Sequence, residues 1–332
     1  MPPVYILSGA RTPFVTWAYG KMGSGEPGGA FKQTDAFDLG AAAVKGALER
    51  AALPPSKVDQ VVFGNTYYAG AHGCYGSRYV GLRAGIPVEV PCLAVNLACG
   101  TGLYALISAA QTVTRDEAHL VVTGGTDNIS QLRKDVFIPS FKDLACGSPI
   151  GKTVQDLAQE YKINGEDQNR WALRSHQVAF QAQAAGRLAE EVVPLGDVRR
   201  DDAIISDPAV SYFQNSKRLF GEQGTVTSAN THGLVDGASA LLVGSEKFLR
   251  EWRGEPLGRF VSSAYAGTKP ERMGVASVPA IRKALTEAKL SLDQMDLFEI
   301  NETFAAQTLI DIQELKIPED KINVNGGAIA LG

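Results

Sequence analysis

The feature that most restricts the fold is an internal repeat. Residues 43–66, AVKGALERAALPPSKVDQVVFGNT, align without a gap with residues 280–303, AIRKALTEAKLSLDQMDLFEINET, and seven of the 24 pairs are identical. Further along, VNLACG (95–100) falls on INVNGG (322–327) in the same order. Two ordered matches indicate a duplicated unit, because self-similarity at a nearly constant spacing is typical of repeated architecture. We therefore expect two similar halves.

Short β-branched runs alternate with helical patterns in the first 125 residues. The expected strands are 4–10, 58–66, 92–98 and 119–126, and the expected helices are 35–53 and 100–115. This alternation predicts parallel strands joined by crossover helices, an α/β fold. The apolar runs lack strict alternation, which indicates that both faces of the sheet are covered.

The chain divides into three parts on the same evidence. Residues 1–125 form the N-terminal half, and the α/β pattern resumes in a C-terminal half at 237–332. Between them, residues 126–236 are rich in turns and contain the longest amphipathic pattern, GEDQNRWALRSHQVAFQAQAAGRL. We interpret this middle part as an inserted lid domain that binds the substrate.

Composition excludes several classes of protein. The 332 residues are 45% hydrophobic and 20% charged with a net charge of −4, which gives no basic surface for nucleic acid or an anionic membrane. No apolar run approaches the length of about 20 residues that a membrane span needs. The four cysteines form neither a CxxC pair nor a metal cluster, so we expect no metal site and a reducing, cytoplasmic location.

Cys99 is the strongest candidate for chemistry. It lies between an apolar run and a helical pattern, in the stretch AVNLACGTGLYALISAA. A helix N-terminus carries partial positive charge and unpaired N–H groups, which favour a thiolate and can stabilise an oxyanion. Gly100 and Gly102 leave room for a substrate beside the backbone. The alternative from these residues alone is a small buried cysteine that fills a gap at a strand end.

The order of five motifs resembles the thiolase family over the whole chain. The family's Asn-x-x-Cys-Gly-Ser-Gly is similar to residues 96–102 around Cys99, and the other four motifs follow in family order at residues 124–130, 224–238, 301–305 and 323–332. The resemblance implies two thiolase halves in five layers, αβαβα, with an inserted lid, and a homodimer or homotetramer. It also implies an acyl-CoA acyltransferase that condenses two acetyl-CoA molecules or cleaves 3-ketoacyl-CoA.

The resemblance also assigns roles to individual residues. Cys99 would form the acyl-enzyme, and Asn301 would hold a water molecule that stabilises an enolate. Coenzyme A thioesters would be substrates, and no cofactor would be bound covalently. The residues that would contact the substrate or coenzyme A are Ser228, His232, Leu234, Met273 and Phe304.

Two other functions stay open from the sequence. A ketoacyl synthase of the same superfamily also starts from a cysteine, but such enzymes have a histidine where this chain has Asn301-Glu302. A non-catalytic acyl-CoA-binding protein of thiolase type would keep the pocket and lose the base.

The chain departs from the family pattern at a few places. Thr231-His232 replaces a serine motif, Ile150-Gly151 replaces a Met-Gly pair, and residues 17–27 read as an extra loop. These differences concern acyl-chain preference and lid contacts. The family's Gly-His-Pro histidine would follow Gly332, and its second cysteine lies further on. We therefore expect residue 332 to be a break and not the natural end, and a chain that lacks both groups.

Overall fold

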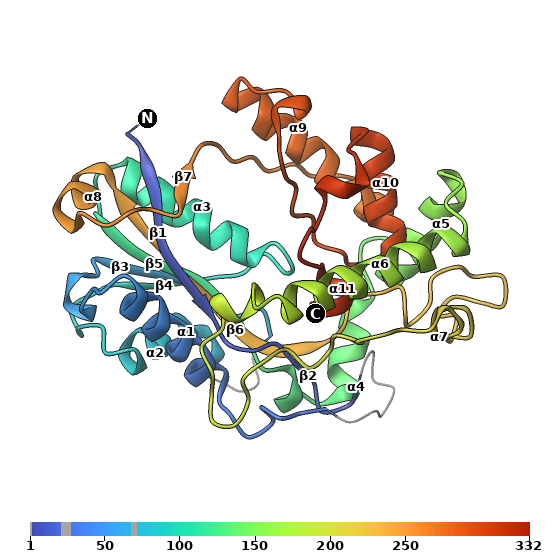
Figure 1. The fold of residues 1–332 in the computed structure, drawn as a ribbon, viewed down its shortest axis with the longest axis horizontal. Coiled ribbons are helices and arrows are strands. Elements are labelled where there is room, and N and C mark those ends of the chain that lie inside the picture. The colour runs from blue at the N-terminus through green and yellow to red at the C-terminus, as the bar shows by residue number, and fades with distance from the viewer. Residues whose placement is uncertain (1, 21–27, 68–71) are drawn as a thin grey trace.

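The computed structural model describes residues 2–20, 28–67 and 72–332, and its centre is one mixed β-sheet. The strand order is β4-β3-β5-β6-β1-β7, and the short β2 pairs with β6 beside this path (Figure 1). The strands are β1 (Val4–Arg11), β2 (Val15–Thr16), β3 (Gln60–Gly64), β4 (Cys92–Val95), β5 (Leu120–Asp127), β6 (Val235–Ser245) and β7 (Gly258–Phe260). The expected strands of the first half are all present.

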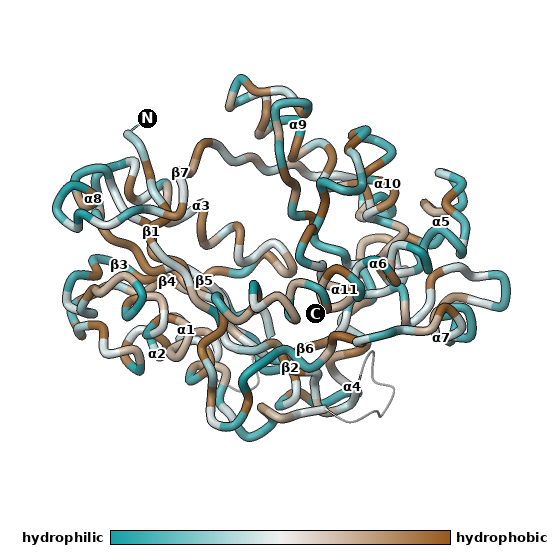
Figure 2. Tube along the Cα trace, in the orientation of Figure 1, coloured by the Kyte–Doolittle hydropathy of each residue, from teal (hydrophilic) through white to brown (hydrophobic). Residues whose placement is uncertain are grey.

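Helices cover both faces of this sheet. On one side lie α1 (Ala36–Arg50) and α2 (Gly76–Arg83), and on the other lies α3 (Thr101–Thr114) (Figure 1). Helix α1 begins where the Asp35 side chain accepts a hydrogen bond from the Phe37 N–H, which satisfies one of the free donors of its first turn. Figure 2 shows hydrophobic residues concentrated along the strands between these layers. The sheet is therefore buried on both faces, as the apolar runs predicted.

The direction of the strands differs from the expectation in part. β3 runs parallel to β4 and β5, but β6 is antiparallel to both β5 and β1. β6 lies inside the first sheet, although the predicted boundary at residue 237 assigned most of it to the C-terminal half. Eight residue pairs with β5, from Leu120–Gly244 to Asp127–Gly237, hold it there. A boundary at 237 therefore does not separate two sheets.

The middle of the chain and its last third form a second, helical body. Its helices are α4 (Lys134–Phe137), α5 (Ile150–Glu160), α6 (Gly165–Ala184), α7 (Val210–Gln214), α9 (Ser277–Ala288), α10 (Ala305–Leu315) and α11 (Ala328–Leu331), and α8 (Glu246–Trp252) follows β6. Figure 1 shows α5 and α6 beside the red α10 and α11. A shared apolar cluster joins Trp171 of α6 to Leu309 of α10 and Ile329 of α11. The long amphipathic helix of the sequence is thus confirmed as α6.

The repeat is visible in the structure. A short 3₁₀ turn follows α1 at Pro55–Lys57, and its counterpart follows α9 at Leu292–Gln294, each 237 positions apart. The strand that comes next, β3, has only a partial equivalent. Residues 296–304 and 321–330 are where the resumed α/β pattern places the equivalent strands. Within the part of the chain that the structure describes, these stretches form only isolated bridges, Phe298 with Ile322 in parallel and Phe304 with Thr231 in antiparallel.

The reason for that difference is local. Asn323 follows the bridge with a left-handed backbone, φ 47°, so the chain turns away after a single paired residue. β3, by contrast, is flanked by β4 on one side and β5 on the other. The α/β arrangement is present, and among the described residues the pairing between these two stretches is the Phe298–Ile322 bridge.

The extra loop expected at 17–27 is described only as far as residue 20. Trp17 is fully buried and packs edge-on against Tyr19 and Phe137. Residues 21–27 lie outside the described residues. None of the helices in the described ranges combines the length and apolar character needed to cross a membrane.

Candidate active site

Cys99 lies on a strained turn between β4 and α3. The preceding Ala98 has φ 45°, a left-handed conformation that costs a residue with a side chain about 1–2 kcal/mol. Two polar side chains hold this turn. The Asn96 Oδ1 accepts a hydrogen bond from the Ala98 N–H at 2.9 Å, and the Thr101 hydroxyl donates to the Ala98 carbonyl at 2.6 Å. The side chains of Asn96 and Thr101 therefore fix the backbone beside the thiol.

A pocket of about 260 Å³ opens beside this turn. It is lined by Cys99 with the end of β5, the start of β6, and the last residue, Gly332. Gly64 lines it too, where a side chain would not fit, since a Cβ would come within 2.1 Å of the Thr101 Cγ2 atom. Ligands of α/β sheets commonly bind at the carboxyl ends of parallel strands, and β3 and β5 both end here.

The ionisation of Cys99 differs from the expectation. Cys99 is reached by solvent, yet burial of its thiol by the surrounding protein raises its pKa. A backbone hydrogen bond of Cys99 lowers the pKa in turn, and the charge of Asp127 raises it again. The helix start alone therefore does not give a thiolate in the unliganded chain. The prediction of an unusually acidic thiol is wrong because desolvation is the larger effect.

Asn301 lies exposed at the surface, and its amide nitrogen donates to the Thr303 hydroxyl at 3.1 Å. The segment that follows it pairs with the turn that carries His232. Thr231 and Phe304 form an antiparallel bridge, and the His232 N–H donates to the Thr303 carbonyl at 3.2 Å. The structure thus brings together two motifs, about 70 residues apart, that the sequence singled out separately.

The other residues predicted to contact the substrate or coenzyme A lie in different surroundings. Phe304 is buried, and it shares an apolar cluster with Met273, Ile150 and Phe220. Ser228 is half-buried, and its N–H donates to the Lys217 carbonyl.

Leu234 is only 4% exposed and lies in the cluster of Trp17 and Phe137. In this structure it packs in a core, and it is absent from the described lining of the Cys99 pocket.

One turn connects the Asn301 region to the Cys99 pocket. The Gly233 N–H donates to the carbonyl of Ala328, the first residue of α11. Gly332, which follows the last residue of α11, lines the pocket. A Cβ on Gly233 would lie 3.7 Å from the Gly332 Cα atom. Cys99 and Asn301 are thus joined through α11 and the 228–234 turn, and no direct contact between the two side chains is present in the described residues.

Comparison with known proteins agrees with this geometry. The family model for the thiolase N-terminal domain matches residues 4–136 and 130–247, and that for the thiolase C-terminal domain matches residues 254–332. The chain belongs to the thiolase family. It is 34% identical to a probable acetyl-CoA acyltransferase of Staphylococcus aureus (strain COL), over 100% of this chain and 88% of the relative.

Other relatives are similarly close. The mitochondrial 3-ketoacyl-CoA thiolase of Rattus norvegicus is 34% identical over 99% of this chain and 87% of its own length. Human mitochondrial 3-ketoacyl-CoA thiolase in complex with CoA has a TM-score of 0.93 at 34% identity, covering 100% of this chain and 87% of that one. The Bacillus anthracis acetyl-CoA acetyltransferase has a TM-score of 0.92 at 30% identity, over 100% of this chain and 88% of the other. The thiolase fold is therefore confirmed.

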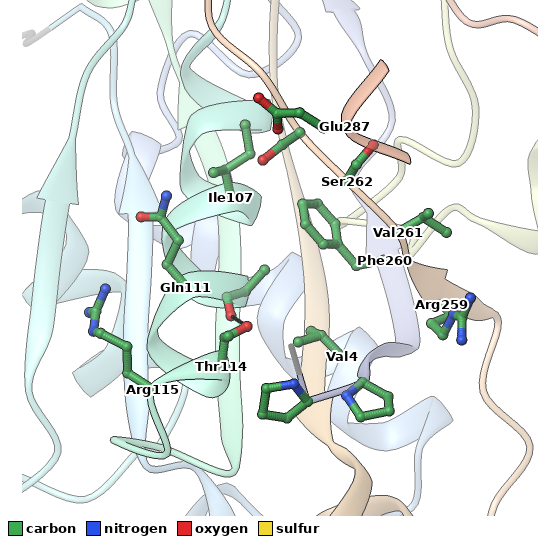
Figure 3. Close-up of a pocket in the computed structure, with 14 residues that line it drawn as sticks. Val4, Ile107, Gln111, Thr114, Arg115, Arg259, Phe260, Val261, Ser262 and Glu287 are labelled. Atoms are coloured by element: carbon green, nitrogen blue, oxygen red, sulfur yellow. Dashed lines mark hydrogen bonds between the residues drawn. The ribbon is translucent and has the colours of Figure 1, made fainter. Parts of the chain in front are cut away.

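A larger pocket in this thiolase lies elsewhere, between α3 and β7. It measures about 520 Å³, and Figure 3 shows Gln111 and Arg115 of α3 on one side of it, Phe260 and Arg259 of β7 on the other, and Glu287 of α9 beyond. None of the described residues around it is a cysteine or a histidine. Size alone would not choose the Cys99 pocket, because this pocket and another of about 760 Å³ beside β1 are both larger.

Sequence reasoning missed two acidic residues of the site. Asp127 lines the Cys99 pocket, and Glu302 lies fully buried beside Asn301. Both lie inside motifs that the sequence analysis singled out, at residues 124–130 and 301–305. A carboxyl group next to an apolar strand end was the available signal, because such a group must find donors when it is buried.

Metal chemistry has no candidate ligands here. Within residues 2–20, 28–67 and 72–332, no three His, Cys, Asp or Glu side chains gather in a way that could hold a metal ion.

Proposed function

We propose that this thiolase transfers acyl groups between coenzyme A thioesters, with Cys99 as the nucleophile. The single observation that carries the proposal is Cys99 on a strained turn in an open pocket at the strand ends. The named activities of the relatives support it, as does the human structure described as a complex with CoA. Condensation of two acetyl-CoA molecules and cleavage of 3-ketoacyl-CoA are the two directions of this chemistry.

The first step follows from nucleophilic catalysis. The Cys99 sulfur attacks the thioester carbonyl, the bond to the coenzyme A sulfur breaks, and coenzyme A leaves with the proton that the thiol gave up. Because burial raises the pKa of Cys99, the thiol must lose its proton in the complex with substrate. The acyl-enzyme then transfers its acyl group to the second substrate.

The substrate side of the proposal uses the second cluster of predicted residues. Met273 and Phe304 share an apolar surface suited to the uncharged pantetheine arm, and Asn301 and His232 lie on the two paired segments beside it. Ser228 lies on the same turn as His232. Coenzyme A thioesters are proposed as substrates with no covalently bound cofactor.

Acyl transfer to the enzyme gives the direct test. We expect incubation with acetyl-CoA to add one acetyl group to the peptide that contains Cys99, detected by mass spectrometry. Cys99→Ala should abolish the adduct, and Cys74→Ala, which changes another exposed cysteine, should leave it intact. Saturable binding of acetyl-CoA with no acetylated Cys99 would instead support the non-catalytic acyl-CoA-binding alternative.

We also propose a homo-oligomer, and the supporting feature is the free edge of the sheet. Among the described residues β4 pairs only with β3, and it exposes Leu93, while Val88, four residues before the strand, and Leu97, two residues after it, are exposed as well. An apolar edge strand is a template for pairing with another chain. Light scattering should give a dimer or tetramer, and Leu93→Lys should shift it toward the monomer. An unchanged mass would contradict this. A cytoplasmic location is proposed on the sequence argument, and none of the four cysteines forms a disulfide in the structure.

A further inference from the structure

Asp127 ends β5 directly beside the nucleophile. It lines the same pocket as Cys99, and its partner across the ladder is Gly237 of β6. Neither the sequence motifs nor the proposed acyl transfer gives this carboxyl a function. Among the described residues that line the pocket there is no lysine, arginine or histidine, so its charge has no cationic partner there.

The position of the carboxyl is fixed by donors on one oxygen. The Asp127 Oδ1 accepts hydrogen bonds from the Asn65 side-chain nitrogen at 2.9 Å and from the N–H groups of Thr66 and Tyr67 at 3.0 and 2.9 Å. All three donors belong to the loop that leaves β3. A carboxyl held in this way cannot swing away from the pocket, so its distance from Cys99 is set by the fold.

We propose that Asp127 is a positioning residue that acts through Cys99: its charge, fixed at the pocket wall, adds to the burial of the thiol in keeping it protonated until substrate binds. The proposal rests on the proposed role of Cys99 as the nucleophile. A thiol kept neutral is protected from stray alkylation and oxidation, because the thiolate is the reactive form. The Cys99 thiol then loses its proton when the charge in this pocket changes.

The electrostatics of the neighbours support the proposal. Burial raises the pKa of Asp127 to about 6, against the donors of Tyr67 and Thr66 that lower it, so the carboxyl is mostly ionised at neutral pH. The titratable groups that face it are Cys99, from the turn before α3, and Tyr67, from the loop after β3. For Tyr67, burial raises the pKa, and the charges of Cys99 and Asp127 raise it further.

The test replaces the charge and keeps the shape. Asp127→Asn retains an Oδ1 acceptor for all three donors and removes the negative charge. We expect the pKa of Cys99 to fall, and alkylation of Cys99 by iodoacetamide at pH 7.5 to become about three- to tenfold faster. The pH profile of alkylation, followed on the Cys99 peptide by mass spectrometry, gives both values. It needs no acyl-CoA turnover, so it fails separately from the proposed function.

Two variants serve as controls. Asp59→Asn alters a carboxyl that likewise accepts two backbone N–H groups, from His119 and Leu120, but at the opposite end of β5. We expect it to keep the wild-type profile. Asp127→Glu keeps the charge and should stay close to wild type. A profile of Asp127→Asn that superimposes on wild type, or equal shifts in Asp127→Asn and Asp59→Asn, would overturn the proposal.

A second measurement uses the unaltered protein, in case Asp127→Asn does not fold. Iodoacetate is anionic and iodoacetamide is neutral, so a fixed negative charge slows the first reagent selectively. We expect the rate with iodoacetate, divided by the rate with iodoacetamide, to be lower at Cys99 than at the exposed Cys74 of the same chain. Equal ratios at the two cysteines would contradict a charge at the pocket wall.

Discussion

At the scale of single residues, the turn before α3 carries the most information. Ala98 is held in a left-handed conformation by Asn96 and Thr101, and the thiol follows it directly. Backbone strain of this kind persists only where the surrounding structure fixes it. The strain therefore places the sulfur, and the two polar side chains maintain the strain.

Thr101→Val tests this arrangement. The change removes a hydroxyl that donates to the Ala98 carbonyl and accepts the Leu97 N–H at 2.8 Å. We expect a loss of about 0.5–1.5 kcal/mol in the free energy of unfolding, because partly buried backbone groups lose a hydrogen-bond partner. The rate of acetylation of Cys99 should fall with it. Thr114→Val, which removes a hydroxyl bonded to the Ala110 carbonyl at the other end of α3, should cost less and leave acetylation unchanged.

The chemical role of a residue could be predicted where it followed from the residue type and its position in the sequence. Cys99 was found from its position at a helix start, and the structure confirms a pocket there. Its raised pKa could not be predicted, because desolvation depends on which segments fold over the thiol. Asp127 was missed for the same reason: its donors come from a loop 60 residues earlier.

At the scale of elements, Glu302 joins three segments. The Trp171 indole N–H and the Ser175 hydroxyl of α6 donate to its carboxylate at 3.0 and 2.7 Å. The Asn323 amide and the Ile329 N–H donate to it at 3.0 and 3.1 Å. The helix of the middle region is thereby tied to the segment that ends at the Cys99 pocket.

Glu302→Gln should therefore weaken the helical body. The new amide group would face donors and lack one acceptor, so we expect unfolding to become easier by about 1–3 kcal/mol. Urea denaturation followed by circular dichroism measures it. Glu314→Gln changes a surface carboxylate that bonds Tyr161 and Arg282, and it should cost less than about 1 kcal/mol. An equal loss in the free energy of unfolding for the two variants would show that the buried hydrogen bonds of Glu302 stabilise the fold no more than those of a surface carboxylate.

Helices were easier to predict than strands in this chain. α6 and α9 follow from amphipathic periodicity and local caps such as Asn164. The strands expected at 296–304 and 321–330 did not follow, because a strand exists only through its neighbours, and Asn323 turns the chain after one bridge. β6 was recognised as a strand, but its place between β5 and β1 depends on pairing that sequence patterns do not encode.

At the scale of the whole molecule, buried carboxyls couple stability to pH. Burial raises the pKa of Asp311 to about 7 and those of Asp127 and Asp236 to about 6. Each folded-state pKa lies above the unfolded value, so the folded chain binds more protons between these values. The stabilising contribution is complete below about pH 4 and is lost as the pH rises through 6 to 7.

Asp311→Asn isolates the largest of these contributions. The carboxyl accepts a hydrogen bond from Ser277 at 2.7 Å and another from Gln307, and an amide can pair with the same two side chains. The free energy of unfolding, measured by thermal unfolding from pH 4 to 8, should decline less with rising pH in the variant. The difference from wild type should be on the order of 2–4 kcal/mol across the range. The exposed Asp156→Asn should keep the wild-type slope. A slope that Asp311→Asn leaves unchanged would mean that this carboxyl titrates normally.

The junction at Glu302 also determines when parts of the chain can finish folding. Its donors on α6 lie 131 and 127 positions before it, and those near the C-terminal end lie 21 and 27 positions after it. During synthesis α6 leaves the ribosome long before its acceptor does. Contacts so distant along the chain form late, since the intervening loop must close first. Helix α6 must therefore stay incompletely anchored until the chain has been translated past Ile329.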